Sequence, residues 1–269
     1  MNPGIYPDLS NEDYHSGPGV SKSGLTKFKK SPAHYVQYMK ERDEPKTPQK
    51  LDDLRFGCMA HLAVLEPEKF EGAPVFEGSR RSGNAWKAFH AEHGRDYLLR
   101  KEVQIIKDMA EAVHDNPIAY KLLNTPGVVE ESCFWYDETS GELCRTRPDR
   151  RKNNGTWIDY KTCKDASPRG FSKAIADYGY HIQAAMALDG YKANKIELSH
   201  FFFVAQEKEK PYNVEVYRLA DEAIRIGQLE YQELLLQFAD CKIANNWHGY
   251  TDGNLNNIDL PDWYYKQNS

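Results

Sequence analysis

Two aspartates and a lysine stand at a spacing that can build a divalent-cation site. Asp149 follows Arg147-Pro148, and after nine further residues the run Asp159-Tyr160-Lys161-Thr162 begins. Side chains alternate along a strand with a period of two, so a strand through this run points Asp159 and Lys161 to the same face. A short turn brings Asp149, at the end of the preceding strand, opposite Asp159. We therefore expect two carboxylates and an ammonium to converge at one edge of a sheet.

These groups suit the hydrolysis of a phosphodiester. Mg²⁺ prefers hard oxygen ligands in octahedral geometry and is typically held by one or two carboxylates together with substrate phosphate. Asp149 and Asp159 supply the carboxylates, and the backbone carbonyl of Tyr160 is a candidate third oxygen. Lys161 can hold or polarise the attacking water, or neutralise charge in the transition state. The metal polarises the phosphoryl oxygen and generates the nucleophile.

Short patterns of this kind also arise by chance, and the alternative is a surface pair of aspartates neutralised by a lysine. Two other side chains favour the catalytic interpretation. His61 lies in Gly57-Cys58-Met59-Ala60-His61, where small residues let a helix approach a metal or backbone closely. Gln183, on a later helix, has an amide that can orient Lys161 or a phosphate. The alternatives are a packed helical histidine and a solvated glutamine.

The distribution of charge along the chain also favours a phosphodiester substrate. The 269 residues include 35 Lys and Arg against 40 Asp and Glu, a net charge of −5, which argues against diffuse binding of polyanions. Residues 145–173 nevertheless hold nine basic and three acidic side chains, so this segment carries +6 and the remainder −11. A solvated charged face is the alternative. We expect DNA to lie along this segment and the outer surface to be acidic.

The elements expected to position these residues form a mixed α/β fold, a central β-sheet flanked by helices with an N-terminal helical elaboration. Ser21 is expected to cap a short helix. Apolar periodicity predicts helices over 52–66, 85–92, 102–123, 171–193 and 221–245. β-Branched and aromatic runs predict strands over 128–136, 143–150, 155–162, 197–206 and 212–219. The first two strands are expected to form one hairpin around residues 139–141, and the last two another.

No boundary for a second domain is evident. We interpret 1–269 as one domain, with an N-terminal extension over 1–50, a core over about 51–245 and a tail over 246–269. The longest apolar stretches, such as 201–205, are far shorter than a membrane-spanning helix, and the N-terminus does not resemble a signal peptide. The five cysteines are scattered without a CxxC pair. This usage is typical of a reducing cytoplasm and provides no thiolate zinc site.

The chain resembles a known family, the RecE-type exonucleases (exonuclease VIII) in the RecB-like branch of the PD-(D/E)XK nucleases. The resemblance runs from about residue 3 to the long C-terminal helix. Its catalytic motifs are Gly57-x-x-x-His61, Pro148-Asp149, Asp159-Tyr160-Lys161-Thr162 and Gln183. Its other motifs are Pro3-Gly4-Ile5-Tyr6, Ser10-Asn11-Glu12-x-Tyr14-His15, Gly17-Pro18-Gly19-Val20-Ser21-Lys22-Ser23, Leu65-Glu66-Pro67-Glu68, Arg80-Arg81 and Gly141-x-Leu143-Cys144-Arg145-x-Arg147-Pro148-Asp149.

The resemblance implies an activity, a cofactor and partners. The activity is Mg²⁺-dependent 5′→3′ degradation of one strand of linear double-stranded DNA, with Mn²⁺ as a substitute ion, leaving a 3′ single strand for recombination. The implied assembly is a ring-shaped homo-oligomer around DNA, a tetramer being favoured, with a RecT-type single-strand annealing protein as partner, often encoded by phage or prophage. Neither an iron–sulfur cluster, a nucleotide cofactor nor a membrane partner is expected.

The resemblance also assigns roles residue by residue. Asp149, Asp159 and His61 are implied metal ligands, Lys161 the catalytic lysine and Gln183 a supporting residue. Glu131 lies where relatives in the family carry an acidic residue. Many relatives carry a tyrosine four positions after the glutamine, where this chain has Ala187. Tyr191, one helical turn further on, either substitutes for that tyrosine or belongs to the core.

Additional basic and aromatic residues are candidates for binding DNA. Arg80 and Arg81 lie in a Ser/Gly-rich loop that can present them to phosphate, and Trp86 can stack on a base. The alternative is an ordinary exposed loop with a buried tryptophan. The remaining candidates for phosphate contacts are Arg145, Arg147 and Lys164.

Two other functions compete with exonuclease activity. A structure-specific or single-strand endonuclease has the same fold and the same catalytic residues. A non-catalytic DNA-binding module is the other alternative, and the intact acid pair and lysine argue against it.

Overall fold

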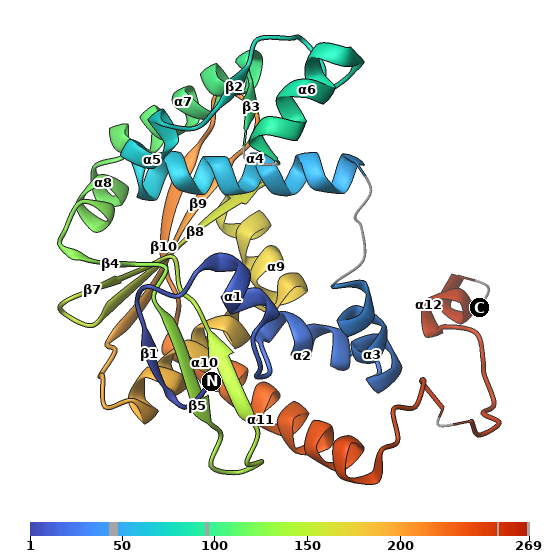
Figure 1. Ribbon diagram of the computed structural model, residues 1–269. Helices are drawn as coiled ribbons and strands as arrows, with labels where there is room; N and C mark the ends of the chain where they lie inside the picture. The colour runs from blue at the N-terminus through green and yellow to red at the C-terminus, as the bar shows by residue number, and fades with distance from the viewer. Residues whose placement is uncertain (43–47, 95–96, 252, 268–269) are drawn as a thin grey trace.

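A five-stranded sheet lies at the centre of the protein, in the order β10-β9-β8-β7-β4 (Figure 1). The computed structural model describes residues 1–42, 48–94, 97–251 and 253–267. The strands of this sheet are β4 (Gly127–Val129), β7 (Arg150–Lys152), β8 (Thr156–Cys163), β9 (His200–Glu207) and β10 (Val214–Arg218). Strands β8 and β9 are parallel, whereas the other neighbouring pairs are antiparallel. The expected mixed central sheet is therefore confirmed.

Helices cover both faces of this sheet (Figure 1). Trp157 of β8 packs into the core formed with α9 (Pro168–Tyr178), α10 (Tyr180–Ala193) and α11 (Asp221–Ala244). Ile158 and Tyr160 point the other way, into the core formed with α4 (Pro48–Leu65), α7 (Arg100–Asp115) and α8 (Pro117–Leu123). Because β8 is buried on both faces, its side chains can reach helices on either side of the sheet.

A second, antiparallel sheet joins the N-terminus to the body in the order β1-β5-β6. Its strands are β1 (Gly4–Tyr6), β5 (Ser132–Tyr136) and β6 (Leu143–Thr146). The N-terminal helices are α1 (Asn11–Ser16), α2 (Lys22–Phe28) and α3 (Pro32–Glu41). Ser21 caps α2 as predicted, since its hydroxyl accepts a hydrogen bond from the Gly24 N–H at 3.3 Å. The other described elements are α5 (Pro67–Glu71), β2 (Val75–Phe76), α6 (Gly83–His93), β3 (Leu98–Leu99) and α12 (Asp262–Gln267).

Two predicted strands are each divided between the two sheets. The run 128–136 becomes β4 and β5, because Glu130 between them has a φ of 49° and turns the chain. The run 143–150 becomes β6 and β7, and Pro148 lies at the break, where a residue without an N–H cannot continue a ladder. The hairpins β5–β6 and β9–β10 are both present as predicted.

Two predicted helices are also divided. The helix expected over 102–123 is interrupted at Asn116, whose side chain caps α8 by accepting from the N–H groups of Ile118 and Ala119 at 3.1 and 3.0 Å. The helix expected over 171–193 is interrupted at Gly179, which has a left-handed φ of 65° that suits glycine. The loop expected near 41–49 falls partly on residues 43–47, outside the described residues.

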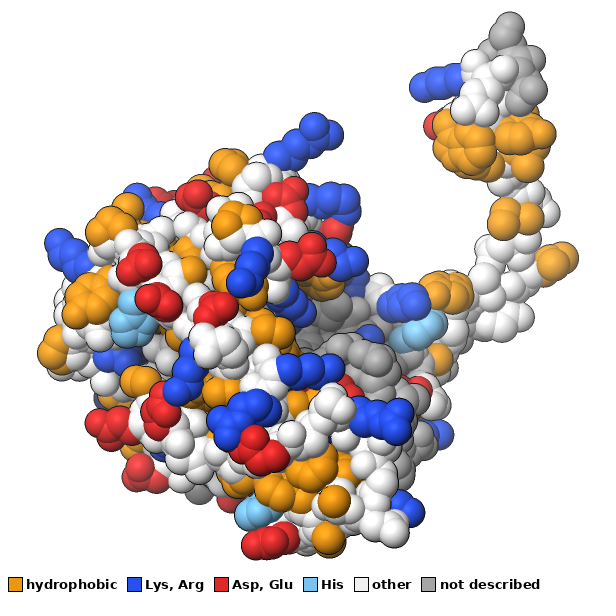
Figure 2. All heavy atoms as spheres, turned by 90° about the horizontal axis from the view of Figure 1, so that it is seen from above, with side chains coloured by type: hydrophobic (Ala, Val, Ile, Leu, Met, Phe, Trp, Pro, Cys, Tyr) orange, Lys and Arg blue, Asp and Glu red, His pale blue; other side chains and the backbone are white. Residues whose placement is uncertain are grey.

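Trp247, shortly after α11, stacks on Tyr35 of α3 at a centroid distance of 5.7 Å. The part of the chain that carries α12 stands away from the body, and apolar side chains gather there (Figure 2). The aromatic residues Trp263, Tyr264 and Tyr265 of α12 are exposed. No helix in the described part of the chain is both long enough and apolar enough to cross a bilayer.

Candidate active site

The register between β7 and β8 brings the two aspartates together. Arg150 pairs with Ile158 in an antiparallel ladder, so one step further along Asp149 lies opposite Asp159. The Asp149 carboxylate also accepts a hydrogen bond from the Tyr160 N–H at 2.7 Å. Because the N–H and C=O of one strand residue point to the same edge, the Tyr160 carbonyl also faces the side of β8 on which Asp149 lies.

Asp159 is fully buried and is held from two directions. One carboxylate oxygen forms an ion pair with Lys161 Nζ, and the other accepts from Gln183 Nε2 at 2.7 Å. Gln183, in the first turns of α10, therefore orients Asp159 rather than Lys161. Burial by itself lowers the pKa of Lys161, but the carboxylates of Asp159 and Asp149 outweigh it and raise that pKa. Lys161 is consequently an ammonium at neutral pH.

His61 approaches Asp149 from α4, which covers the face of the sheet opposite to α10. Its Nδ1 lies 3.5 Å from Asp149 Oδ2, and its ring packs edge-to-face on Tyr160 at a centroid distance of 5.0 Å. Burial and the charge of Lys161 lower the pKa of His61 to about 4. His61 is thus neutral at physiological pH, so its contact with Asp149 is not an ion pair. Neutral imidazole is the form that binds a metal.

The two carboxylates destabilise each other's charge. Burial raises the pKa of Asp149 well above its ordinary value, repulsion from Asp159 raises it further, and the charge of Lys161 opposes the rise. A divalent cation beside both groups would relieve this repulsion. Two carboxylates, a neutral imidazole and a backbone carbonyl form a donor set that fits such an ion.

The carboxylates and His61 are not already arranged as a closed ligand cluster. Within the described ranges, no three His, Cys, Asp or Glu side chains surround one point as metal ligands. The reason is that Asp159 turns its oxygens to Lys161 and Gln183, while Asp149 turns to Tyr160 and His61. One or two carboxylates with several waters is the usual way in which proteins hold Mg²⁺, so this arrangement suits Mg²⁺ better than an ion that requires a full protein cage.

Sequence patterns missed two residues near these carboxylates. Lys22, the first residue of α2, has its Nζ 5.3 Å from the centre of the Tyr180 ring, and Lys161 Nζ is 5.1 Å from the same centre. Glu130 donates its N–H to the Asp149 carbonyl at 3.0 Å, and its charge adds to the raised pKa of Asp149. The N-cap at Ser21 predicted where α2 begins. Local sequence contains no signal that the start of α2 lies beside Tyr180 of α10.

Glu131 and Tyr191 contact each other and not the carboxylate pair. Glu131 is buried and accepts from Arg151 Nε at 2.8 Å and from the Tyr191 hydroxyl at 3.0 Å. The Tyr191 ring is fully buried and packs edge-on against Trp157 at 4.8 Å. Of the two alternatives for Tyr191, the structure favours the core residue.

Two arginines predicted to contact phosphate instead hold the N-terminal segment. Arg145 is buried, and its guanidinium donates to the Gly17 carbonyl at 2.6 Å. Arg147 donates to the Leu9 carbonyl at 2.6 Å and to the Ser132 hydroxyl at 2.8 Å. These hydrogen bonds connect residues 9–17 to β5 and β6, so both side chains act in the fold.

Two of the other candidates for binding DNA also have partners inside the protein. Arg81 forms two hydrogen bonds to the Glu102 carboxylate, at 2.9 and 2.7 Å. Trp86 donates its indole N–H to the Tyr97 hydroxyl at 2.5 Å. Both side chains are therefore committed to internal contacts, whereas Arg80 and Lys164 are exposed and stay candidates for phosphate.

Most basic side chains of residues 145–173 bond to groups of the protein itself. Besides Arg145, Arg147, Arg151 and Lys161, Arg150 donates to the Thr125 carbonyl at 2.9 Å. Basic and acidic side chains are interspersed on the face shown in Figure 2. The positive charge of these five side chains is therefore directed at partners within the protein.

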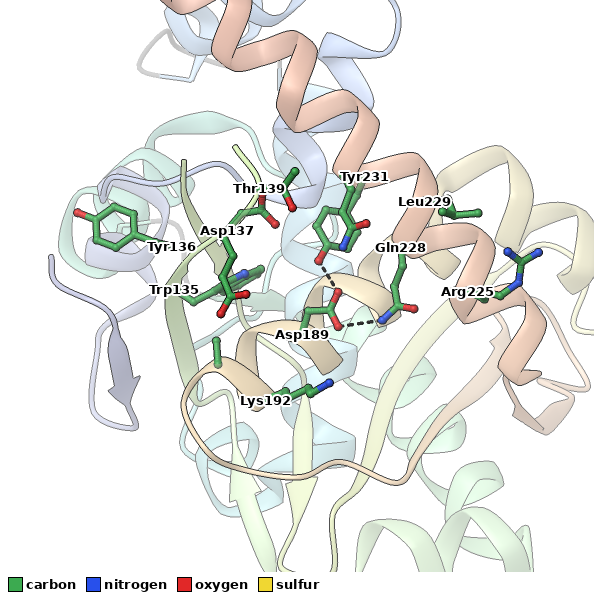
Figure 3. A pocket seen from close by; sticks show the side chains of 13 residues that line it. Trp135, Tyr136, Asp137, Thr139, Asp189, Lys192, Arg225, Gln228, Leu229 and Tyr231 are labelled. Atoms are coloured by element: carbon green, nitrogen blue, oxygen red, sulfur yellow. Dashed lines mark hydrogen bonds between the residues drawn. The ribbon is translucent and has the colours of Figure 1, made fainter. Parts of the chain in front are cut away.

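A cavity of about 580 Å³ lies apart from the carboxylates, between β5, α10 and α11 (Figure 3). Asp189 accepts from Gln228 Nε2 at 2.8 Å and from the Tyr231 hydroxyl, which joins α10 to α11. The lining residues include none of the groups around Asp159. We therefore place the candidate active site at the carboxylates and not at this cavity.

Comparisons with known proteins identify a family and a fold for this chain. A family model described as a PDDEXK-like domain of unknown function (DUF3799) matches residues 21–256. No protein among those with curated functions matches the chain. A solved structure named "Putative exonuclease", from Eubacterium rectale, has a TM-score of 0.62 at 14% identity over 88% of this chain and 87% of that one. The structure of SSO0001 has a TM-score of only 0.37 at 13% identity, over 87% and 81% of the two chains. At these identities the first likeness shows the fold alone, and the second carries no weight.

Proposed function

Because the chain belongs to the family of PDDEXK-like domains that its residues 21–256 match, we propose that it is a metal-dependent DNA exonuclease of the RecE type. The family and the fold support a nuclease. The observation that carries the proposal is the convergence of Asp149, Asp159 and Lys161 where β7 meets β8. PD-(D/E)XK nucleases typically use divalent metals, and we propose Mg²⁺, with Mn²⁺ as a substitute.

The roles of the side chains follow from their contacts and charges. Asp149 and Asp159 would hold the cation, with the Tyr160 carbonyl and the neutral His61 as further donors. The bound cation supplies Lewis acidity to the phosphoryl oxygen and lowers the pKa of water. Lys161 is charged at neutral pH, so it donates hydrogen bonds to the attacking water or to the developing negative charge and does not act as a base. Gln183 keeps Asp159 in position.

We further propose 5′→3′ digestion of one strand of linear duplex, leaving a 3′ single strand for recombination by annealing. The motif resemblance from residue 3 to the long C-terminal helix supports this polarity. It also supports a ring-shaped homo-oligomer, with a tetramer favoured, and a RecT-type annealing protein as partner. The exposed aromatic side chains of α12 are compatible with contacts between subunits.

The deciding assay uses linear duplex labelled separately at its 5′ and 3′ ends, with Mg²⁺. We expect release of 5′ label first and persistence of the complementary strand. Lys161→Ala should abolish digestion, whereas Lys173→Ala, at an exposed lysine paired with Asp177, should digest normally. Digestion that is unaffected by Lys161→Ala would refute the assignment. Cutting of closed circular DNA, which has no ends, would identify an endonuclease instead.

A further inference from the structure

A second lysine lies at the candidate active site, and neither its family motif nor the proposed mechanism gives it a role. Lys22 begins α2, more than a hundred residues from β8 in sequence. Its ammonium and that of Lys161 lie over the same ring, at 5.3 and 5.1 Å from the centre of Tyr180. Tyr180, at the start of α10, thus holds two positive charges next to Asp159.

The two lysines differ in how their charge is compensated. Lys161 is ion-paired with Asp159. Among the described residues, Lys22 Nζ makes no ion pair or hydrogen bond, and its contact is the face of Tyr180. A partly buried ammonium without an anionic partner is costly unless something else compensates its charge. A single ring face contributes little toward that compensation.

The electrostatic environment of Lys22 agrees with this geometry. Burial and the positive charge of Lys161 lower the pKa of Lys22 to about 8, and Asp159 opposes the shift. Two other lysines of this region, Lys27 and Lys29, lie on the protein surface. Lys29 is exposed and pairs with Glu230 at 2.7 Å, and Lys27 is exposed on the same helix. Of these three lysines, Lys22 is the one that lies over the Tyr180 ring next to Lys161.

We propose that Lys22 binds a phosphate of the DNA strand that is cut, holding it beside Asp149 and Asp159. This inference rests on the proposed function of the site as a nuclease, and it adds a substrate contact to it. The ligand class is a phosphodiester, whose non-bridging oxygens accept hydrogen bonds from ammonium groups and supply the missing negative charge. Lys22 is thereby a substrate-binding residue, distinct from Lys161, which faces the metal carboxylates.

The test measures how salt affects DNA binding. Labelled linear duplex is titrated with the full-length protein in Ca²⁺, at several salt concentrations, for the native chain, Lys22→Met, Lys22→Arg and the control Lys27→Met. Loss of one phosphate contact should reduce the slope of log K against log[salt] by about 1. We expect this reduction, and weaker binding by about tenfold at low salt, only for Lys22→Met. Lys22→Arg should keep most of the native slope.

A second measurement uses the native protein, so it does not depend on the folding of a variant. Reductive methylation of lysines is followed by mass spectrometry with and without duplex. DNA should protect Lys22 and leave Lys27 unprotected. Equal salt slopes for the native chain and Lys22→Met, or equal labelling of Lys22 with and without DNA, would overturn the inference.

These results separate the inference from the proposed function. If the native protein digests DNA but Lys22→Met has a native salt slope and a native KM, the inference fails and the nuclease stands. If the native protein binds DNA through Lys22 but does not cut it with Mg²⁺ or Mn²⁺, the nuclease fails and the phosphate contact stands.

Discussion

Two ionic clusters meet near β7, where Asp149 of one and Arg151 of the other are two residues apart, yet their charges are arranged in opposite ways. We call them the Glu131 cluster (Glu131, Arg151 and Tyr191) and the Asp159 cluster (Asp149, Asp159, Lys161, His61 and Lys22). In the first, the carboxylate of Glu131 meets an arginine at 2.8 Å and a tyrosine hydroxyl at 3.0 Å. The hydrogen bond that Arg151 donates to Glu131 raises the pKa of Arg151, which stabilises its charged form.

In the Asp159 cluster the pKa values of three groups are shifted in the direction that disfavours the charged form. The pKa of Asp149 is raised, and those of His61 and Lys22 are lowered to about 4 and about 8. Like charges stand close to each other, acid to acid and lysine to lysine. The Glu131 cluster is complete without a ligand, whereas the Asp159 cluster would be completed by a cation and a phosphate. Perturbed groups of this kind concentrate at functional sites.

The largest effect expected from this difference is on catalysis. Asp159→Asn should reduce digestion of linear duplex by about 10³-fold or more, because it removes a metal carboxylate and the partner of Lys161. Thermal stability should fall less than for Glu131→Gln, because relief of the repulsion between Asp159 and Asp149 offsets part of the ion pair that Lys161 loses. Digestion rates and melting curves check both statements, with Asp177→Asn at an exposed pair as control. A variant that loses stability but keeps its activity would reverse the roles of the clusters.

The next effect concerns stability at the Glu131 cluster. Glu131→Gln leaves Arg151 without its counter-charge and should cost about 3 kcal/mol of unfolding free energy. That corresponds to a fall in Tm of about 6–12 °C for a domain of this size. Activity per folded molecule should change by less than about twofold. Loss of activity at unchanged Tm would instead bring Glu131 into catalysis. Glu222→Gln, at the exposed Arg225 pair, should leave Tm unchanged.

A pH-dependent effect follows from Asp149. Its folded pKa is raised, so the folded protein binds this proton more tightly than the unfolded chain. Metal-free stability therefore falls as pH rises from about 4, the ordinary pKa of aspartate, through the folded value. At pH 8 without metal, Asp149→Asn should be more stable than the native chain by about 1–2 kcal/mol, and the gain should vanish near pH 4.

Metal provides the matched control for the Asp149 prediction. Mg²⁺ should raise the Tm of the native protein by binding the folded state and should do so much less for Asp149→Asn. Calorimetric scans with and without Mg²⁺ at both pH values measure this difference. Equal stability of the two proteins at pH 8, with no response to metal in either, would contradict the proposed repulsion.

The smallest effect is expected at Gln183. Gln183→Met removes the hydrogen bond that it donates to Asp159 at 2.7 Å and should lower kcat by roughly tenfold with KM unchanged. A change in KM alone would indicate that Gln183 contacts the substrate. Steady-state kinetics distinguish the two outcomes.

Much of the architecture follows from local patterns in the sequence. Strand β8, both hairpins and α11 were predicted within a few residues, because their apolar and β-branched runs are long and are bounded by turns. The breaks at Glu130 and Pro148 were missed. There the backbone changes sheet, and a run of strand-forming residues does not reveal which neighbour each half will pair with.

The proximity of Asp149, Asp159 and Lys161 was likewise predicted from spacing, because period-two alternation and a short turn can bring these residues together. The roles of the arginines were not. Arg145 and Arg147 bond to carbonyls of residues 9–17, and Arg151 to Glu131, contacts that depend on tertiary structure. Lys22 was missed for the same reason. Its neighbours Lys161 and Tyr180 come from distant elements.

The most direct test of the central claim is to locate Mn²⁺ by anomalous diffraction in crystals of the native protein and of Asp149→Asn. We predict one strong peak in the native crystal within coordination distance of Asp149 and Asp159, and its loss in the variant. A peak at Glu131 or elsewhere, or a peak of equal strength in both crystals, would contradict the assignment of the Asp159 cluster as the metal-dependent site.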